Sequence, residues 1–285
     1  LRKQRRTLVR DYIALDLGRR GITRKEIERR VRTAAQMVNM ETRLDRKLEQ
    51  LSGSEPLRAG IARAIAIESS VLMMDDPLCF VDAPLLFPIR SFFRDLHRQL
   101  QITLIYATRN WVDALTIGDR VAVIKPSGTL QQVASPRMLY DNPKTVFVAG
   151  FIGDPGMNFF SARLTDRRGK VVADCRDFAI EVPGSKAAFF RPYTGMDVIL
   201  GFRPEHIYLP GYTSEGIKES VAKAQVEMIE FRGAEVIAQL VTKSQPPFFG
   251  RFDPHTDLCV GNEVSVTFDL NRMQIFDRET EMAIR

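Results

Sequence analysis

Two short apolar runs constrain the fold of this chain most. Residues 71–74 and 102–107 have the length of buried strands, and the segment between them carries a helical pattern from about residue 89 to 99. A strand, a connecting helix and a second strand form a unit of parallel sheet. Strands of parallel sheets are buried on both faces, which suits uninterrupted apolar runs. The sequence therefore predicts an α/β domain built around these two strands.

The residues before these runs predict helices. Apolar residues recur at helical spacing over residues 27–38, and Thr23 with Glu26 three residues later matches a capping box. We expect a second helix after the turn at 51–54, with Pro56 in its first turn, where a missing N–H costs little.

Charge and composition narrow the function classes. Residues 1–50 hold 15 Lys and Arg against 7 Asp and Glu, an excess that fits a solvated helical face or contact with an acidic partner, anionic lipid or nucleic acid. No run approaches the roughly 18 apolar residues of a membrane span. Cys79, Cys175 and Cys259 match no metal-ligand spacing.

The pattern changes near residue 153. Before it we expect a short helix at 112–116, a hairpin of strands 120–124 and 130–133, and helices at 136–140 and 145–151. After it, short strands separated by turns predict a small OB-like barrel or pair of barrels. The expected strands are 159–164, 170–174, 197–201, 221–231, 235–241, 248–252, 263–268 and 273–276. The predicted domains are residues 1–153, with a helical subdomain at 1–55, and residues 154–285.

Several stretches occur in the order of a known family. They are Leu51-Ser52-Gly53-Ser54-Glu55 with Ala62-Arg63-Ala64, Val71 to Pro77, Val81-Asp82-Ala83, Ile105 to Arg109, Ala114 to Arg120, Phe147 to Gly153 with Met157-Asn158-Phe159, Gly201 to His206 and Leu270 to Asp277. Together they resemble the ATP-binding subunits of ABC importers of the carbohydrate-uptake type. The resemblance implies the C-terminal part of an α/β, P-loop ABC ATPase domain followed by an all-β OB-like regulatory domain of the TOBE type.

The resemblance also implies roles for individual residues. Ser52, Gly53, Ser54 and Glu55 stand at the signature turn, which in this family meets the ATP held by a second subunit. Asp82 stands in the D-loop, and Asp75 stands where the family holds Mg²⁺ through water. Asp76 and Arg109 occupy the catalytic and switch positions. The implied cofactors are ATP and Mg²⁺.

Four positions depart from the family. Asp76 replaces a catalytic Glu, Arg109 a switch His, Ser54 a Gly and Glu55 a Gln. The shorter Asp76 side chain would place water poorly, and Glu55 would bring a negative charge near a phosphate. No Gly-x-x-x-x-Gly-Lys-Ser/Thr motif occurs, since the chain opens at Leu1 beyond the place of the family's Walker A part. We therefore expect a degenerate subunit that does not hydrolyse ATP alone.

The expected function is ATP binding in a bacterial importer of a sugar, polyol or glycerol-phosphate-like solute. The expected partners are a second ABC ATPase subunit, two transmembrane permeases and, indirectly, an extracytoplasmic solute-binding protein, at the cytoplasmic side of the inner membrane. The alternatives are a homodimeric importer ATPase with tolerated substitutions and a pseudo-ATPase scaffold or regulator. Nucleic acid is not expected as a partner, because residues 151–285 carry 19 acidic against 16 basic residues.

Overall fold

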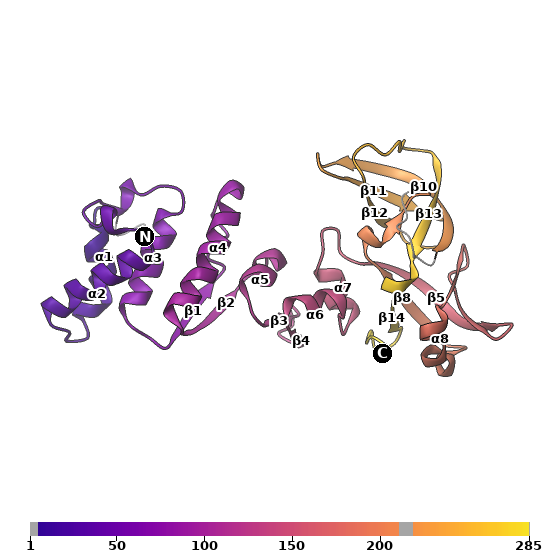
Figure 1. Ribbon diagram of the computed structural model, residues 1–285, viewed down its shortest axis with the longest axis horizontal. Helices are drawn as coiled ribbons and strands as arrows, with labels where there is room; N and C mark the ends of the chain where they lie inside the picture. Colours follow the sequence, from indigo (N-terminus) through magenta and orange to yellow (C-terminus); the bar gives the residue numbers. More distant parts are fainter. Residues whose placement is uncertain (1–4, 211–218, 285) are drawn as a thin grey trace. The chain divides into compact units, whose positions relative to one another are not determined.

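The computed structural model describes residues 5–210 and 219–284 and divides the chain into two compact units, Leu1–Asp119 and Arg120–Arg285 (Figure 1). Among these described residues, no helix combines the length and the apolar character needed to cross a bilayer.

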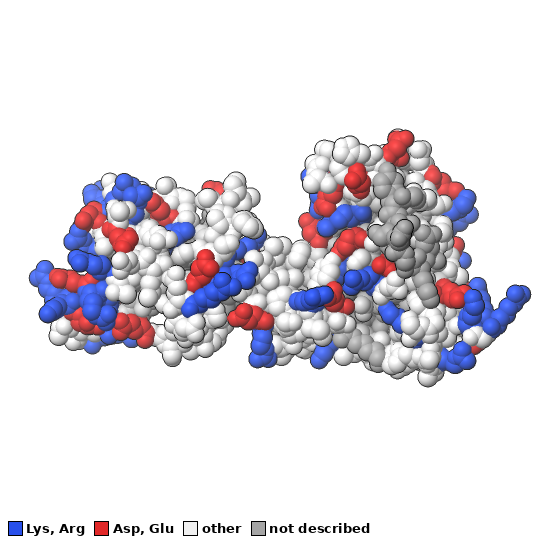
Figure 2. Space-filling view, viewed as in Figure 1, with Lys and Arg blue, Asp and Glu red and all other residues white. Residues whose placement is uncertain are grey.

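Unit 1 begins with packed helices. Helices α1 (Val9–Gly18), α2 (Arg24–Met37) and α3 (Glu55–Ala66) share one buried core, with the 3-10 turns Glu41–Arg43 and Leu48–Gln50 between α2 and α3. The helices expected at 27–38 and after 51–54 are confirmed, whereas α1 was not anticipated. Figure 2 shows Lys and Arg gathered over the end of unit 1 that carries α1 and α2.

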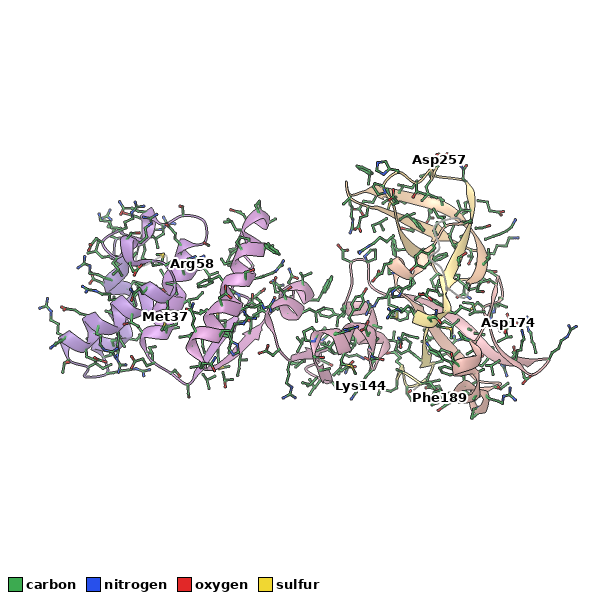
Figure 3. All side chains as sticks on the ribbon, viewed as in Figure 1. Met37, Arg58, Lys144, Asp174, Phe189 and Asp257 are labelled. Atoms are coloured by element: carbon green, nitrogen blue, oxygen red, sulfur yellow. The ribbon has the colours of Figure 1, made fainter. Side chains whose placement is uncertain are left out.

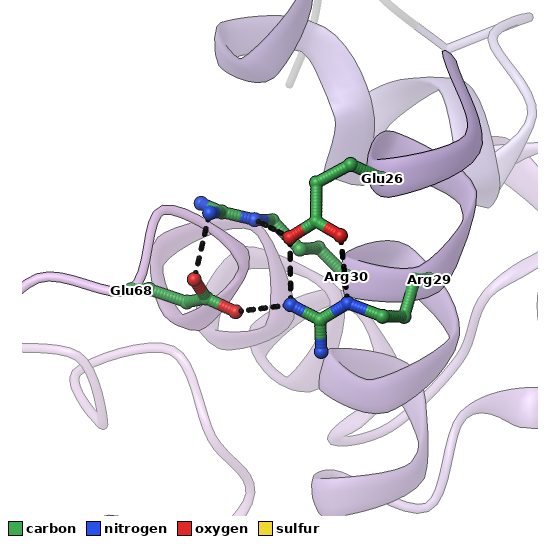
Figure 4. Close-up of polar contacts among 4 residues, drawn as sticks. All are labelled: Glu26, Arg29, Arg30 and Glu68. Carbon is green, nitrogen blue, oxygen red and sulfur yellow. Dashed lines mark hydrogen bonds and ion pairs between the residues drawn. The ribbon is translucent and has the colours of Figure 1, made fainter. Parts of the chain in front are cut away.

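The start of α2 differs from the prediction in its polar contacts. Thr23 is the N-cap residue, but its side chain makes no cap hydrogen bond. Glu26 instead accepts from Arg29 and Arg30, and both arginines also reach Glu68 (Figure 4). Charge-assisted bonds are stronger than neutral ones, which explains why the Glu26 side chain joins this network and not the predicted capping box. The network ties α2 to the segment that follows α3.

The predicted strand, helix and strand form the rest of unit 1. Strands β1 (Val71–Asp75) and β2 (Thr103–Ala107) pair in parallel, joined by α4 (Ala83–Leu100), and α5 (Trp111–Ile117) follows. One face packs on the helical core, where the Tyr106 and Phe93 rings meet edge to face at 5.6 Å. The opposite face is exposed at Val71, Met73 and Ile105, so the expected burial on both faces is wrong.

Unit 2 starts with the predicted hairpin of β3 (Val121–Ile124) and β4 (Leu130–Ala134), then α6 (Pro136–Asp141) and α7 (Val146–Phe151). These elements belong to the same compact unit as the strands that follow. The predicted domain boundary at 153/154 therefore lies inside unit 2. It stays a prediction, because the two compact units meet at 119/120.

Buried Arg203 is one reason for this grouping. Its guanidinium donates to the carbonyls of Ile152 and Tyr140 and lies 3.8 Å from the centre of the Tyr140 ring. These contacts join α6 and the end of α7 to the end of strand β8 (Asp197–Phe202).

The remaining strands form two five-stranded antiparallel sheets, as expected for an OB-like domain. The first follows the order β12-β11-β10-β13-β9, and the second the order β14-β8-β5-β6-β7. Their bounds are β5 (Asn158–Arg167), β6 (Lys170–Asp174), β7 (Ala179–Glu181), β8 (Asp197–Phe202), β9 (Ile207–Tyr208), β10 (Glu219–Phe231), β11 (Val236–Val241), β12 (Phe248–Phe252), β13 (Glu263–Asp269) and β14 (Gln274–Asp277). Helix α8 (Gly184–Phe190), which the sequence did not indicate, follows β7.

Aromatic side chains hold the two sheets together. Phe160 of β5 meets Phe248 of β12 and Phe268 of β13 at ring-centroid distances of 5.1 and 5.5 Å. All three residues are buried, so both sheets share one core.

Candidate functional site

The signature turn is shaped by a left-handed residue. Gly53 has a φ of +55°, a conformation that glycine adopts without the steric cost of a Cβ. Helix α3 begins two residues later at Glu55, followed by Pro56 in its first turn. The Glu55 N–H donates to the Ser52 carbonyl at 3.0 Å and Pro56 has no N–H, so this helix end favours an anion through its positive end rather than through a row of free donors.

Ser54 fits the turn without strain. Its φ of −87° lies in the ordinary right-handed region. Its hydroxyl accepts a hydrogen bond of 3.3 Å from Nε of Arg58, a residue of α3 marked in Figure 3. Arg58 also donates to the Val38 carbonyl at 3.0 Å and lies over the Phe92 ring. Arg58 is therefore held in place, and Ser54 with it.

Glu55 is paired with a cation. Its Oε1 lies 2.7 Å from Nε of Arg43, and its Oε2 accepts the backbone N–H of Ser52 at 3.1 Å. The Arg43 guanidinium, more than any other group, holds the pKa of Glu55 below its usual range. The sequence placed a negative charge at the signature turn, and the structure adds a positive charge beside it.

The second part of the site lies at the carboxyl ends of β1 and β2. Asp75 pairs in register with Ala107, so the residues that follow each strand meet at one edge of the sheet. Asp76 has a φ of +42° and donates its N–H to the Ala107 carbonyl at 2.8 Å. Asp is one of the few residues found repeatedly in this region.

The Asp76 carboxylate contacts the two residues that follow β2, Thr108 and Arg109. One oxygen accepts from the Thr108 hydroxyl at 3.2 Å, and the other lies 3.3 and 3.4 Å from two nitrogens of Arg109. The Arg109 side chain is 91% exposed and that of Asp76 25% exposed. The two predicted catalytic residues therefore contact each other.

The remaining predicted residues are accessible. Asp75 is exposed at the end of β1, and Asp82 is the exposed N-cap residue of α4. Within the described part of the chain no three His, Cys, Asp or Glu side chains gather as a metal site. Mg²⁺ commonly uses only one or two carboxylates together with waters and phosphates, so an exposed Asp75 carboxylate fits that ion.

Sequence reasoning missed Arg43 and Thr108. Arg43 lies twelve residues before Glu55, and nothing in the local pattern linked the two. Thr108 stood inside a stretch that carried the resemblance, but its contact with Asp76 depends on the register of β1 and β2.

Two family descriptions match unit 2. Residues 153–207 match the MalK OB fold domain, and residues 200–276 match the TOBE domain. The OB-like, TOBE-type character predicted from the sequence is confirmed.

Curated relatives match over nearly the whole chain. The oligosaccharides import ATP-binding protein MsmX of Bacillus subtilis is 39% identical and matches 97% of this chain and 75% of its own length. The osmoprotective compounds uptake ATP-binding protein GgtA of Synechocystis sp. is 39% identical, with coverage of 97% and 75%. The trehalose/maltose import ATP-binding protein MalK of Thermococcus litoralis is 39% identical, with coverage of 97% and 74%.

A solved structure of cbiO1 from Clostridium perfringens, part of the ABC transporter complex cbiONQ, is 24% identical. The match covers 46% of this chain and 52% of that chain, with a TM-score of 0.44.

Proposed function

Because this chain belongs to the family of ATP-binding subunits of carbohydrate-import ABC transporters, we propose that it serves such an importer as a subunit with a weakened hydrolytic site. Its solute is a sugar, polyol or glycerol-phosphate-like compound. Its partners are a second, competent ATPase subunit and two permeases, which an extracytoplasmic binding protein supplies with solute. It works at the cytoplasmic side of the inner membrane.

In this proposal the signature turn faces the nucleotide of the partner subunit. MgATP, when bound, supplies the phosphoryl group that is transferred to water. The Ser52 hydroxyl and the backbone of the turn would bind phosphate oxygens, the left-handed Gly53 lets that backbone come close, and the positive end of α3 favours the anion. Asp82 lies at the subunit boundary, and Asp75 holds Mg²⁺ through water in this chain's own half-site.

The Asp76 carboxylate, which is both already bonded and set back from the position of a glutamate, carries the proposal of a weakened site. The Asp76 carboxylate bonds to Thr108 and Arg109, so neither oxygen is free of a protein donor. Arginine stays protonated at any physiological pH, unlike the histidine that the family has at this position. Asp76 is also one methylene shorter than glutamate, and so is poorly placed to accept a proton from water.

The test compares Ser52→Ala with Asp76→Ala in the transporter complex isolated with this chain. Ser52→Ala removes a hydroxyl from a charged acceptor, an interaction worth about 1.5–3 kcal/mol. ATP turnover should therefore fall about 10-fold or more. Asp76→Ala should reduce turnover far less, since its carboxylate serves the weak site. Ser127→Ala, in the exposed β3–β4 turn, is the control.

The reverse order of damage would make this chain the hydrolytic partner and refute the degenerate assignment. Equal damage by both substitutions, in a complex that holds two copies of this chain, would favour a homodimer. A chain that is isolated without any permease would favour the scaffold alternative.

A further inference from the structure

Arg43 and Glu55 form an ion pair that belongs to the signature turn. Arg43 ends the 3-10 turn Glu41–Arg43, whereas Glu55 begins α3. One Glu55 oxygen lies 2.7 Å from Arg43 Nε, and the other accepts the Ser52 N–H. The side chains are 33% and 22% exposed, so water screens the pair only in part. A single carboxylate thus links a distant cation to the backbone of the residue that would face phosphate.

We propose that Arg43 is a positioning residue for the partner's nucleotide: it neutralises Glu55 and holds that carboxylate on the Ser52 N–H, so that the turn can accept a phosphate. This inference rests on the proposed function, because it assumes that the signature turn faces a nucleotide.

The charge balance at the turn supports this role. Ser52 lies within hydrogen-bond distance of the Glu55 carboxylate, so a phosphate that contacts the Ser52 hydroxyl would come within a few ångströms of it. Like charges at that distance repel strongly when they are partly buried. Arg43 offsets this repulsion, and Arg46 adds a weaker positive field. Ser52 and Gly53 can then bind an anion although an acidic residue stands beside them.

The effects of single substitutions separate this role of Arg43 from a purely structural role. A structural ion pair loses stability when either partner is removed, so both single variants would be impaired. A charge-balancing pair responds in opposite directions. Removal of Arg43 leaves a bare carboxylate that repels MgATP, and removal of the Glu55 charge leaves a bare guanidinium that attracts it.

The experiment measures KM and kcat for MgATP in the isolated transporter complex that carries Arg43→Ala, Glu55→Gln or both. We expect Arg43→Ala to raise KM about 5- to 10-fold. Glu55→Gln should lower KM, and the double variant should return KM to near the wild-type value. An increase in KM in both single variants, or a double variant no better than Arg43→Ala, would overturn the inference.

Arg63→Ala is the matched control. Arg63 pairs with Asp16 at 2.7 Å between α3 and α1, and the two side chains are 28% and 27% exposed. Arg63→Ala removes an ion pair of similar exposure in the same unit, so it shows how a loss of stability alone affects the complex. It should leave the KM for MgATP unchanged. Ser52→Ala distinguishes a failure of the proposed function from a failure of the role proposed for Arg43. Without any effect of Ser52→Ala on turnover, the proposed function itself fails. A loss with Ser52→Ala and an unchanged KM with Arg43→Ala refutes only the role of Arg43.

Discussion

If the proposed function holds, Asp76→Glu and Arg109→His together should raise ATP turnover in the transporter complex, and the structure indicates which of the two changes has the larger effect. The Arg109 side chain is 91% exposed, and exposed ion pairs contribute only about 0.2–1 kcal/mol. Release of the Asp76 carboxylate by Arg109→His alone should therefore change turnover at most about 5-fold. Asp76→Glu moves the carboxylate by one methylene, and a misplacement of about 1 Å can cost about 100-fold. The double variant should thus gain most of its activity from position 76.

The assay is steady-state ATP hydrolysis by the complex with each single variant and the double variant. Arg137→His is the matched control, since Arg137 pairs with Asp141 at 3.3 Å and is 92% exposed. Asp76→Glu should also lower the melting temperature slightly, because its φ of +42° suits Asp better than Glu. Arg109→His alone matching the double variant would refute the reasoning, since the ion pair would then be the limit. Unchanged turnover with an intact fold would assign the limit to Ser54, Glu55 or the partner subunit.

Two further predictions concern unit 2. Burial lowers the pKa of His206 to about 4, so the unfolded chain takes up this proton first as the pH falls, and stability is lost between about pH 6.5 and 4. Relative to wild type, the melting temperature of His206→Gln should be higher at pH 5 than at pH 7. The same difference in melting temperature at both pH values would contradict this. Arg203→Met removes a buried charge but leaves the carbonyls of Ile152 and Tyr140 without the Arg203 donor. It should therefore lower the free energy of unfolding, measured in urea, by about 1–3 kcal/mol. A more stable variant would show that the desolvation of the charge outweighs its hydrogen bonds.

The elements with a clear periodic pattern were predictable from the sequence. The β1 and β2 strands, the β3–β4 hairpin and the longer strands of unit 2 lie where the apolar runs and turn residues predicted them, whereas the short strands β7 and β9 were not predicted. Helix α8 was missed because Gly184 to Phe190 is short and ends in two aromatic residues, which also suit a strand. Local propensity settles long elements better than single helical turns.

Burial was harder to predict than secondary structure. The apolar run at 71–74 predicted a strand covered on both sides, yet Met73 is exposed while Met74 packs against the helical core. An alternating strand places neighbouring side chains on opposite faces, so each face depends on what other elements supply. The strand is a local property, whereas its coverage is not.

The site shows the same division between local and non-local information. The left-handed turn at Gly53 follows from a residue type that sequence reveals, and so does the strand end at Asp75. The net charge at the signature turn cannot be predicted in this way. Glu55 considered alone predicts that a phosphate would be repelled. Only the fold brings Arg43 to within 2.7 Å of that carboxylate. A substitution that looks damaging in sequence can thus be offset by a second residue, and the two must be varied together to learn what either does.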